Sequence, residues 1–195
     1  MKTTSKGRNN KLACQIGEFL VCAELGRRGL IATPFSGNVP AFDILAADHQ
    51  CNTVPIQVKA SRGKNWPSDA RSWMEIELDL GSKIQVNRGA RKIENPDLIY
   101  VHVVIAKADE GTDQYFILTK KQLQKAAIRS YSAWMEPKGW KRPRKPESFD
   151  CRYSIEDLEQ YRDNWKLITA KLCPSTAGER NRAVASGKEM GVEDA

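Results

Sequence analysis

Histidine is scarce in this chain, and the cysteine spacings that hold metals are missing. The 195 residues include two histidines, His49 and His102, which lie far apart in the sequence. The five cysteines form no Cys-x-x-Cys pair, and their number is odd. These absences disfavour a multi-histidine metal centre, a zinc knuckle, a disulfide framework and chemistry that needs a histidine base. If the chain is an enzyme, carboxylates and lysine must carry its chemistry.

Long apolar runs are also absent. No segment approaches the ~18–20 apolar residues needed to span a bilayer, and residues 1–10 are polar and basic, unlike a secretory signal. We therefore expect a cytoplasmic protein with reduced thiols and no membrane partner. With 41% hydrophobic residues, a chain of this length is expected to form one domain around one core.

Positive charge is concentrated in one segment. The formal net charge is +7, yet residues 120–145 hold nine basic residues and one acidic residue. The same segment contains Tyr131, Trp134 and Trp140. Cations interleaved with aromatics favour a polyanion with stackable faces, which is nucleic acid. The alternative is a solvated helix followed by a proline-rich loop, because Lys and Arg favour the surface of any protein.

Apolar periodicity predicts an α+β (α/β) domain with one central mixed β-sheet flanked by helices. A helix with apolar residues on both sides, and therefore buried, is expected over residues 11–28, ended by Gly29. Strands are expected at 30–35, 42–47, 54–60, 74–80, 98–106 and 115–119. Of these, 42–47 and 54–60 should form a hairpin, and 98–106 should be central. Further helices are expected from Thr119 to about residue 130 and over 154–172, the second behind a capping box at Ser154.

The remaining segments complete the expected domain organisation. Residues 1–10 are expected to be a flexible basic arm, and 173–195 a disordered polar tail. A turn is expected at 36–38. Residues 131–150, with three prolines, are expected to be a basic insertion within a domain that spans 11–172.

Polar residues occur on apolar elements at three places. Glu18 lies between Cys14 and Cys22 on one side of the first helix, where a carboxylate is costly unless it meets a cation. Asp43 opens an apolar strand, and Gln57 and Lys59 share one face of the next strand. Each has a structural alternative: Glu18 could pair with a basic residue, and Asp43 could cap a turn.

Taken together, these residues resemble the PD-(D/E)XK nuclease superfamily, which has the restriction-endonuclease-like fold. The matching stretches are Gly17-Glu18 on the first helix, Asp43 on the second strand and Gln57-Val58-Lys59-Ala60-Ser61 on the third. The likeness is to the Gln-x-Lys branch, which includes resolvase-like and intron-encoded homing endonucleases. It departs from the common pattern at Gln57, where an acidic residue is usual, and at Pro40, which lies three residues before Asp43.

The resemblance implies metal-dependent hydrolysis of DNA phosphodiester bonds. Asp43, Gln57, the Val58 carbonyl and Glu18 would hold Mg²⁺, or Mn²⁺ as a substitute, since both prefer oxygen ligands. Lys59 would orient the attacking water or stabilise the phosphate charge. A neutral Gln57 removes one negative charge and weakens metal affinity. A homodimer is expected from the need to cut two strands with one site per chain.

The basic segment then becomes a candidate DNA-binding surface. The residues expected to contact nucleic acid are Arg62, Lys64, Trp134, Lys138, Trp140, Lys141, Arg142, Arg144 and Lys145. Arg62, Lys64 and Trp66 follow Lys59 closely along the chain and could form the near wall of the cleft. For Trp134, packing against the sheet is an equal alternative. RNA remains open as the substrate. Two other functions also remain open: an inactive nucleic-acid-binding module of the same fold, and an accessory interaction protein of a mobile element or defence system.

Overall fold

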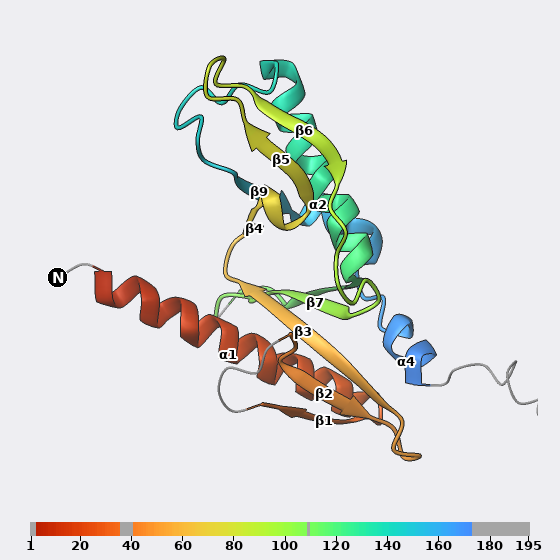
Figure 1. The fold of residues 1–195 in the computed structure, drawn as a ribbon. Helices are drawn as coiled ribbons and strands as arrows, with labels where there is room; N and C mark the ends of the chain where they lie inside the picture. The colour runs from red at the N-terminus through yellow and green to blue at the C-terminus, as the bar shows by residue number, and fades with distance from the viewer. Residues whose placement is uncertain (1–2, 36–40, 109, 173–195) are drawn as a thin grey trace, which may run out of the picture.

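The computed structural model describes residues 3–35, 41–108 and 110–172 (Figure 1). Its centre is a five-stranded sheet of order β1-β2-β3-β7-β8, in which only β3 and β7 are parallel. The strands are β1 (Ile31–Pro34), β2 (Ile44–Ala47), β3 (Thr53–Ser61), β7 (Ile99–Val104) and β8 (Gln114–Thr119). The expected mixed sheet, the β2–β3 hairpin and the central position of β7 are confirmed.

Four further strands form two small antiparallel sheets beside the central one. They pair β4 (Asn65–Asp69) with β9 (Asp150–Ser154), and β5 (Met74–Leu78) with β6 (Gln85–Ala90). The sequence analysis expected only β5 among them. The other three have polar sequences, and β4 pairs with a strand far along the chain, so neither alternation nor a short turn marked them.

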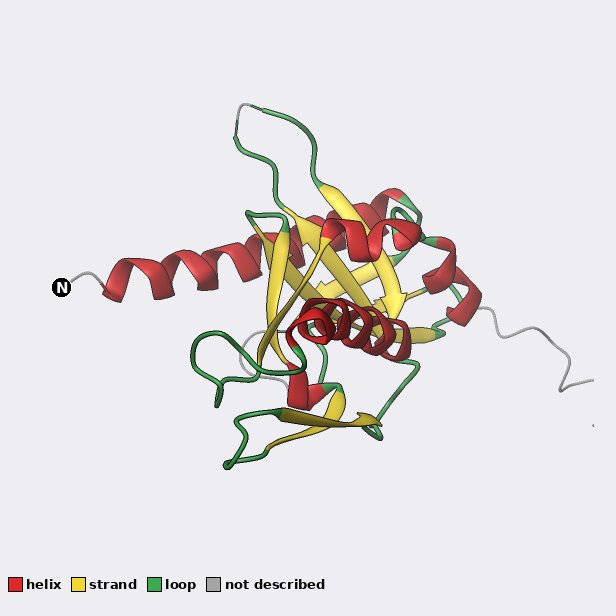
Figure 2. Cartoon of the chain, turned by 90° about the horizontal axis from the view of Figure 1, so that it is seen from above, coloured by secondary structure: helices red, strands yellow, loops and turns green. Residues whose placement is uncertain are grey.

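Helices cover both faces of the central sheet (Figures 1 and 2). The helices are α1 (Thr3–Arg27), α2 (Lys120–Met135), α3 (Ile155–Leu158) and α4 (Lys166–Leu172), with short 3-10 turns η1 (Ala70–Ser72), η2 (Glu136–Lys138) and η3 (Glu159–Tyr161). Alternation along each strand separates two cores. Ile56, Val101 and Ile117 face α1 and α4, whereas Phe116 and Leu118 face α2.

A close approach fixes α1 against β3. A Cβ placed on Gly17 would lie 2.4 Å from the Cβ of Ala60. Only glycine therefore allows this crossing, and the crossing brings the next residue, Glu18, to the end of β3. The helix is not buried on both sides as expected, because Leu12 and Phe19 are 48% and 55% exposed.

Helix ends differ from the sequence expectations in two places. The first helix begins at Thr3, so most of the expected arm is helical. The helix capped by Thr119 has a complete capping box with Gln122 but continues to Met135. Since Tyr131 and Met135 are buried on it, the segment expected as an insertion from 131 begins after α2 instead.

The helix expected over 154–172 is broken into α3, η3 and α4. Asp163 has a positive φ of 49°, and its N–H donates to the carbonyl of Tyr115 at 2.9 Å. A bridge between Phe116 and Arg162 adds this segment to the edge of β8. Edge pairing here replaces the helix. The expected turn at 36–38 and the tail at 173–195 lie outside the described residues.

None of the helices in the described ranges has the length and apolarity required to cross a bilayer.

Candidate active site

The site forms where β2 and β3 separate. Their ladder ends at the Ile44–Ile56 pair, after which the N–H of Asp43 donates to the carbonyl of Ile56 at 2.9 Å. The Asp43 carboxylate then takes the place of the missing strand, since its Oδ2 accepts the N–H of Val58 at 2.7 Å. Beyond Ile56, β3 therefore has no β2 partner at this edge. The backbone N–H of Val58 is hydrogen-bonded to the side chain of Asp43 instead.

Gln57 lies directly beside Asp43. Its Nε2 donates to Asp43 Oδ2 and, at 3.4 Å, to the carbonyl of Val58. Two donors thus share one oxygen of a half-buried carboxylate. These contacts place the amide group of Gln57, the carboxylate of Asp43 and the carbonyl of Val58 around one point.

Glu18 reaches the same point from α1. Burial raises the pKa of Glu18 above its ordinary value, and the nearby charge of Asp43 raises it further. Burial also raises the pKa of the Cys22 thiol, with the charge of Glu18 as a second cause. The sequence left open that Glu18 pairs with a basic residue. Among the described residues, neither Glu18 nor Asp43 forms an ion pair.

These groups open into a cavity of about 460 Å³. Its polar side is formed by Glu18, Asp43, Gln57, Val58 and Lys59, which are the five residues expected to carry catalysis and to bind the metal. They come from α1, the approach to β2 and the middle of β3. The residues expected from the sequence to form one site therefore line one cavity in the fold.

An aromatic wall forms the other side, and of its residues only Trp66 is expected there from the sequence. It consists of Trp66, Trp73, Tyr100 and Tyr153. Tyr100 pairs with Gln57 in the β3–β7 register, and burial, with the charge of Asp43 second, raises its pKa. Alternation in the apolar run 98–106 could have placed Tyr100 on the face shared with His102. Trp66 and Tyr153 could not have been found this way, because they meet through the unexpected β4–β9 pair.

His102 is a buried residue of β7 that contacts another side chain. It is fully buried, its Nε2 lies 3.0 Å from the hydroxyl of Tyr153, and it is the register partner of Lys59. Burial, followed by the charge of Lys59, lowers the pKa of His102 to about 3. The imidazole is therefore neutral near pH 7 and does not serve as a proton acceptor for the pocket.

The donor set of the pocket suits a hard divalent cation. Two carboxylates, one amide oxygen and one backbone carbonyl are oxygen ligands of the kind that Mg²⁺ prefers. Two unpaired carboxylates at one point, with the pKa of Glu18 raised, would gain from a cation. No group of three or more His, Cys, Asp or Glu side chains is placed to hold a metal ion within the described ranges. Gln57 and the Val58 carbonyl would therefore have to complete the ligand set.

Three of the expected nucleic-acid-binding residues form a separate cluster. The Lys138 ammonium and the Arg142 guanidinium lie 4.5 and 5.0 Å from the ring centre of Trp134. Trp134 is 41% exposed and, with Arg142, lines a second cavity of about 410 Å³. Trp140 packs edge-on against Tyr131, with ring centres 6.4 Å apart. Trp134 is therefore a surface residue, whereas Trp140 is half-buried.

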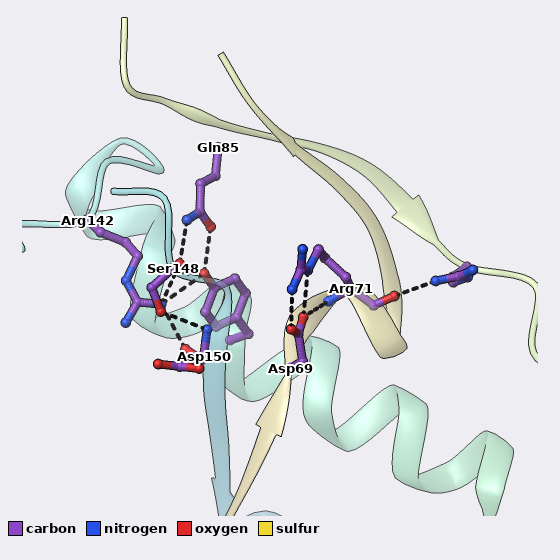
Figure 3. Close-up of polar contacts among 8 residues, drawn as sticks. Asp69, Arg71, Gln85, Arg142, Ser148 and Asp150 are labelled. Atoms are coloured by element: carbon purple, nitrogen blue, oxygen red, sulfur yellow. Dashed lines mark hydrogen bonds and ion pairs between the residues drawn. The ribbon is translucent and has the colours of Figure 1, made fainter. Parts of the chain in front are cut away.

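Arg142 also serves to hold its own loop together (Figure 3). Its Nη1 donates to the carbonyls of Ser148 and Asp150 at 3.0 and 2.8 Å. The other expected cations are exposed and line neither cavity: Arg62 and Lys64 lie between β3 and β4, and Lys141, Arg144 and Lys145 lie on the loop after η2. The structure thus divides the expected set into a self-contacting cluster and separate exposed cations.

Comparisons with known proteins find a similar solved structure but no matching sequence family. No protein-family model matches this sequence, and no curated protein is significantly similar to it. Among solved structures, a bacterial homing endonuclease (I-Ssp6803I) is similar, with 13% sequence identity and a TM-score of 0.45. The aligned region covers 92% of this chain and 98% of that chain.

Proposed function

We propose that this chain is a metal-dependent endonuclease that hydrolyses phosphodiester bonds of DNA, in the manner of the PD-(D/E)XK superfamily. The observation that carries the proposal is the meeting of Glu18, Asp43, Gln57 and Lys59 at one cavity. These residues are polar and come from three elements, and two of them are carboxylates without a basic partner in the described part of the chain.

The chemistry follows from the residues around the cavity. Phosphodiester hydrolysis needs an oriented water and stabilisation of the charge that develops on the phosphate. Glu18, Asp43, Gln57 and the Val58 carbonyl would hold Mg²⁺ or Mn²⁺, which when bound acts as a Lewis acid toward a phosphate oxygen. The ammonium of Lys59 would orient the attacking water or stabilise the phosphate charge. His102 is buried and does not line the cavity, which leaves this role to Lys59.

Substitution of Lys59 tests the proposal. In an assay on supercoiled, linear, branched and single-stranded DNA with Mg²⁺, Mn²⁺ or EDTA, wild type should cut only with metal. Lys59→Ala should slow cutting by about 10²–10⁴-fold, because a group that acts in the transition state is lost, and Asp43→Ala should do the same. DNA affinity should remain nearly unchanged in both.

Lys166→Ala is the matched control, since Lys166 is exposed on α4 and lines none of the cavities described above. It should cut like wild type. Metal-independent cutting, or equal activity of Lys59→Ala and wild type, would refute the proposal.

A second candidate function is an inactive nucleic-acid-binding module of the same fold. The hydrogen bonds from Gln57 and Val58 to one oxygen of Asp43 favour it, because they satisfy part of that carboxylate without a cation. Absence of cutting by wild type, together with salt-sensitive DNA binding, would support this module. Absence of both would instead favour an accessory protein that binds another protein.

A further inference from the structure

A third cavity, lined by basic residues, adjoins the candidate active site. Its volume is about 450 Å³, and two residues of the aromatic wall, Trp73 and Tyr100, line both cavities. The basic cavity is also lined by Arg91, Lys92 and Lys120. These cations come from the segment after β6 and from the first residue of α2. Lys120 begins the basic segment 120–145, but none of the three is expected from the sequence to contact nucleic acid, because they are brought together only by the fold.

The three cations are not neutralised by the protein. Arg91 donates from Nη1 to the carbonyl of Arg71 at 3.0 Å, and Lys120 donates from Nζ to the carbonyl of Glu94 at 2.9 Å. In the part of the chain that is described, none of the three forms an ion pair with a carboxylate. Glu94 is the one acidic residue of the lining. The neighbouring Arg71, by contrast, is paired with Asp69 (Figure 3).

Hydrogen bonds from a buried glutamine fix the walls of this cavity. Gln124 is 7% exposed, and its Nε2 donates to the carbonyls of Trp73 and Arg91 at 2.7 Å each. The N–H of Arg91 also donates to the carbonyl of Trp73 at 3.0 Å. The backbone that carries Arg91 is therefore tied to the backbone of a residue shared with the active site. Such an arrangement holds positive charge at a fixed place before any ligand binds.

We propose that the basic cavity binds a backbone phosphate of the DNA strand that enters the candidate active site, next to the bond that is cut. This inference rests on the proposed function, which places DNA in the adjoining cavity. The cations supply the charge that a phosphate requires, and the shared residues Trp73 and Tyr100 make the two cavities contiguous. The basic loop of residues 139–149 is then not the main phosphate contact close to the cut.

The test measures binding separately from cleavage. In EDTA, the affinity of a short DNA duplex is measured against salt for wild type and for the triple variant Arg91→Ala/Lys92→Ala/Lys120→Ala. The slope of log affinity against log salt should decrease by about 0.9 for each phosphate that the variant no longer neutralises. The matched control is Lys11→Ala/Lys125→Ala/Lys166→Ala, which removes three exposed cations outside both cavities and should leave the slope unchanged. Thermal unfolding verifies the fold, and glutamine at the same three positions replaces alanine if the triple variant unfolds.

A neutral-backbone scan locates the bound phosphate. Methylphosphonate is placed at successive positions of one strand, and wild-type binding should weaken most at a position beside the cut. The triple variant should show no such weakening at that position. An unchanged slope, an equal effect of the control, or equal weakening in the triple variant would overturn the inference. Normal cleavage with an unchanged slope would overturn the phosphate subsite alone, whereas a reduced slope without any cleavage would overturn the nuclease alone.

Discussion

The two faces of the central sheet are stabilised in different ways. The face toward α1 has an almost entirely aliphatic core, with Val21, Leu25 and Ile44 fully buried, and a helix that approaches the sheet as closely as Gly17 allows. The face toward α2 is rich in aromatic residues and also buries Gln85, Gln124 and His102. Each of these polar side chains is hydrogen-bonded. Close packing therefore determines one face, and buried hydrogen bonds determine the other.

The candidate active site lies where the two faces meet. Glu18 comes from the helix on the aliphatic face, and the aromatic wall belongs to the other face. Asp43, at the open edge of β3, lines the same cavity as the residues from both faces. Changes that disturb one face alone should therefore separate what each contributes to stability. Two such changes and a third at the site between the faces follow in order of expected size.

Gln85→Leu should have the largest effect, on the α2 face. The side chain is 1% exposed, and its Nε2 donates to the carbonyl of Ser148 at 2.9 Å (Figure 3). Nε2 also donates to the carbonyl of Pro146 at 2.9 Å, and Oε1 accepts from the hydroxyl of Tyr131 at 2.6 Å. Leucine removes all three hydrogen bonds, and the Ser148 carbonyl keeps the one from Arg142. The Pro146 carbonyl and the Tyr131 hydroxyl lose Gln85 as a partner, so the free energy of unfolding should fall by about 3 kcal/mol. Urea unfolding measures the change.

Gln160→Leu is the control for this change, because Gln160 is exposed. Its effect should stay within about 0.5 kcal/mol of wild type. If Gln85→Leu were equally mild, buried hydrogen bonds would not be what holds the loop of residues 139–149 against β6.

Gly17→Ala should have the next largest effect, on the α1 face. The added methyl would overlap Ala60, so overpacking should outweigh the gain in helix propensity and destabilise the chain by about 1–2 kcal/mol. Ala60→Gly in the same chain should recover most of that stability, since it removes the atom that clashes. Thermal unfolding of the single and double variants gives the coupling.

Gly26→Ala on the same helix provides the matched comparison. Nothing lies within 4 Å of the Cβ it would gain, so it should stabilise the helix by up to about 1 kcal/mol. A Gly17→Ala variant that behaved like Gly26→Ala would show that α1 can move away from β3 at little cost.

The contrast between the faces also explains what the sequence could predict. The aliphatic face is encoded by short-range alternation, so β2, β3, β7 and the positions of Asp43, Gln57 and Lys59 could be expected from neighbouring residues. The α2 face depends on pairs between distant segments, such as Trp66 with Tyr153 in β4–β9. No local pattern marks those pairs. Apart from Trp66, the residues of the aromatic wall and the basic cavity beside it were therefore not expected there. The cations expected to bind DNA were those of the dense basic segment and those that follow Lys59 along the chain.

Glu18→Gln should give the smallest effect, and it tests the site between the faces. Because the folded pKa of Glu18 is raised above its unfolded value, the contribution of Glu18 to wild-type stability falls as pH rises from the ordinary carboxyl range through that raised pKa. Glutamine does not titrate. The variant should therefore be slightly more stable than wild type at pH 7 without divalent cations, and the difference should vanish below about pH 4, where Glu18 is protonated in both states.

Mg²⁺ should stabilise wild type at pH 7 more than Glu18→Gln, because a bound cation offsets the repulsion between Glu18 and Asp43. Thermal unfolding at pH 4 and pH 7, with Mg²⁺ and with EDTA, measures all four cases. A Glu18→Gln variant less stable than wild type at pH 7 in EDTA would mean that the folded chain stabilises the charge of Glu18, and the case for a cation at this point would be lost.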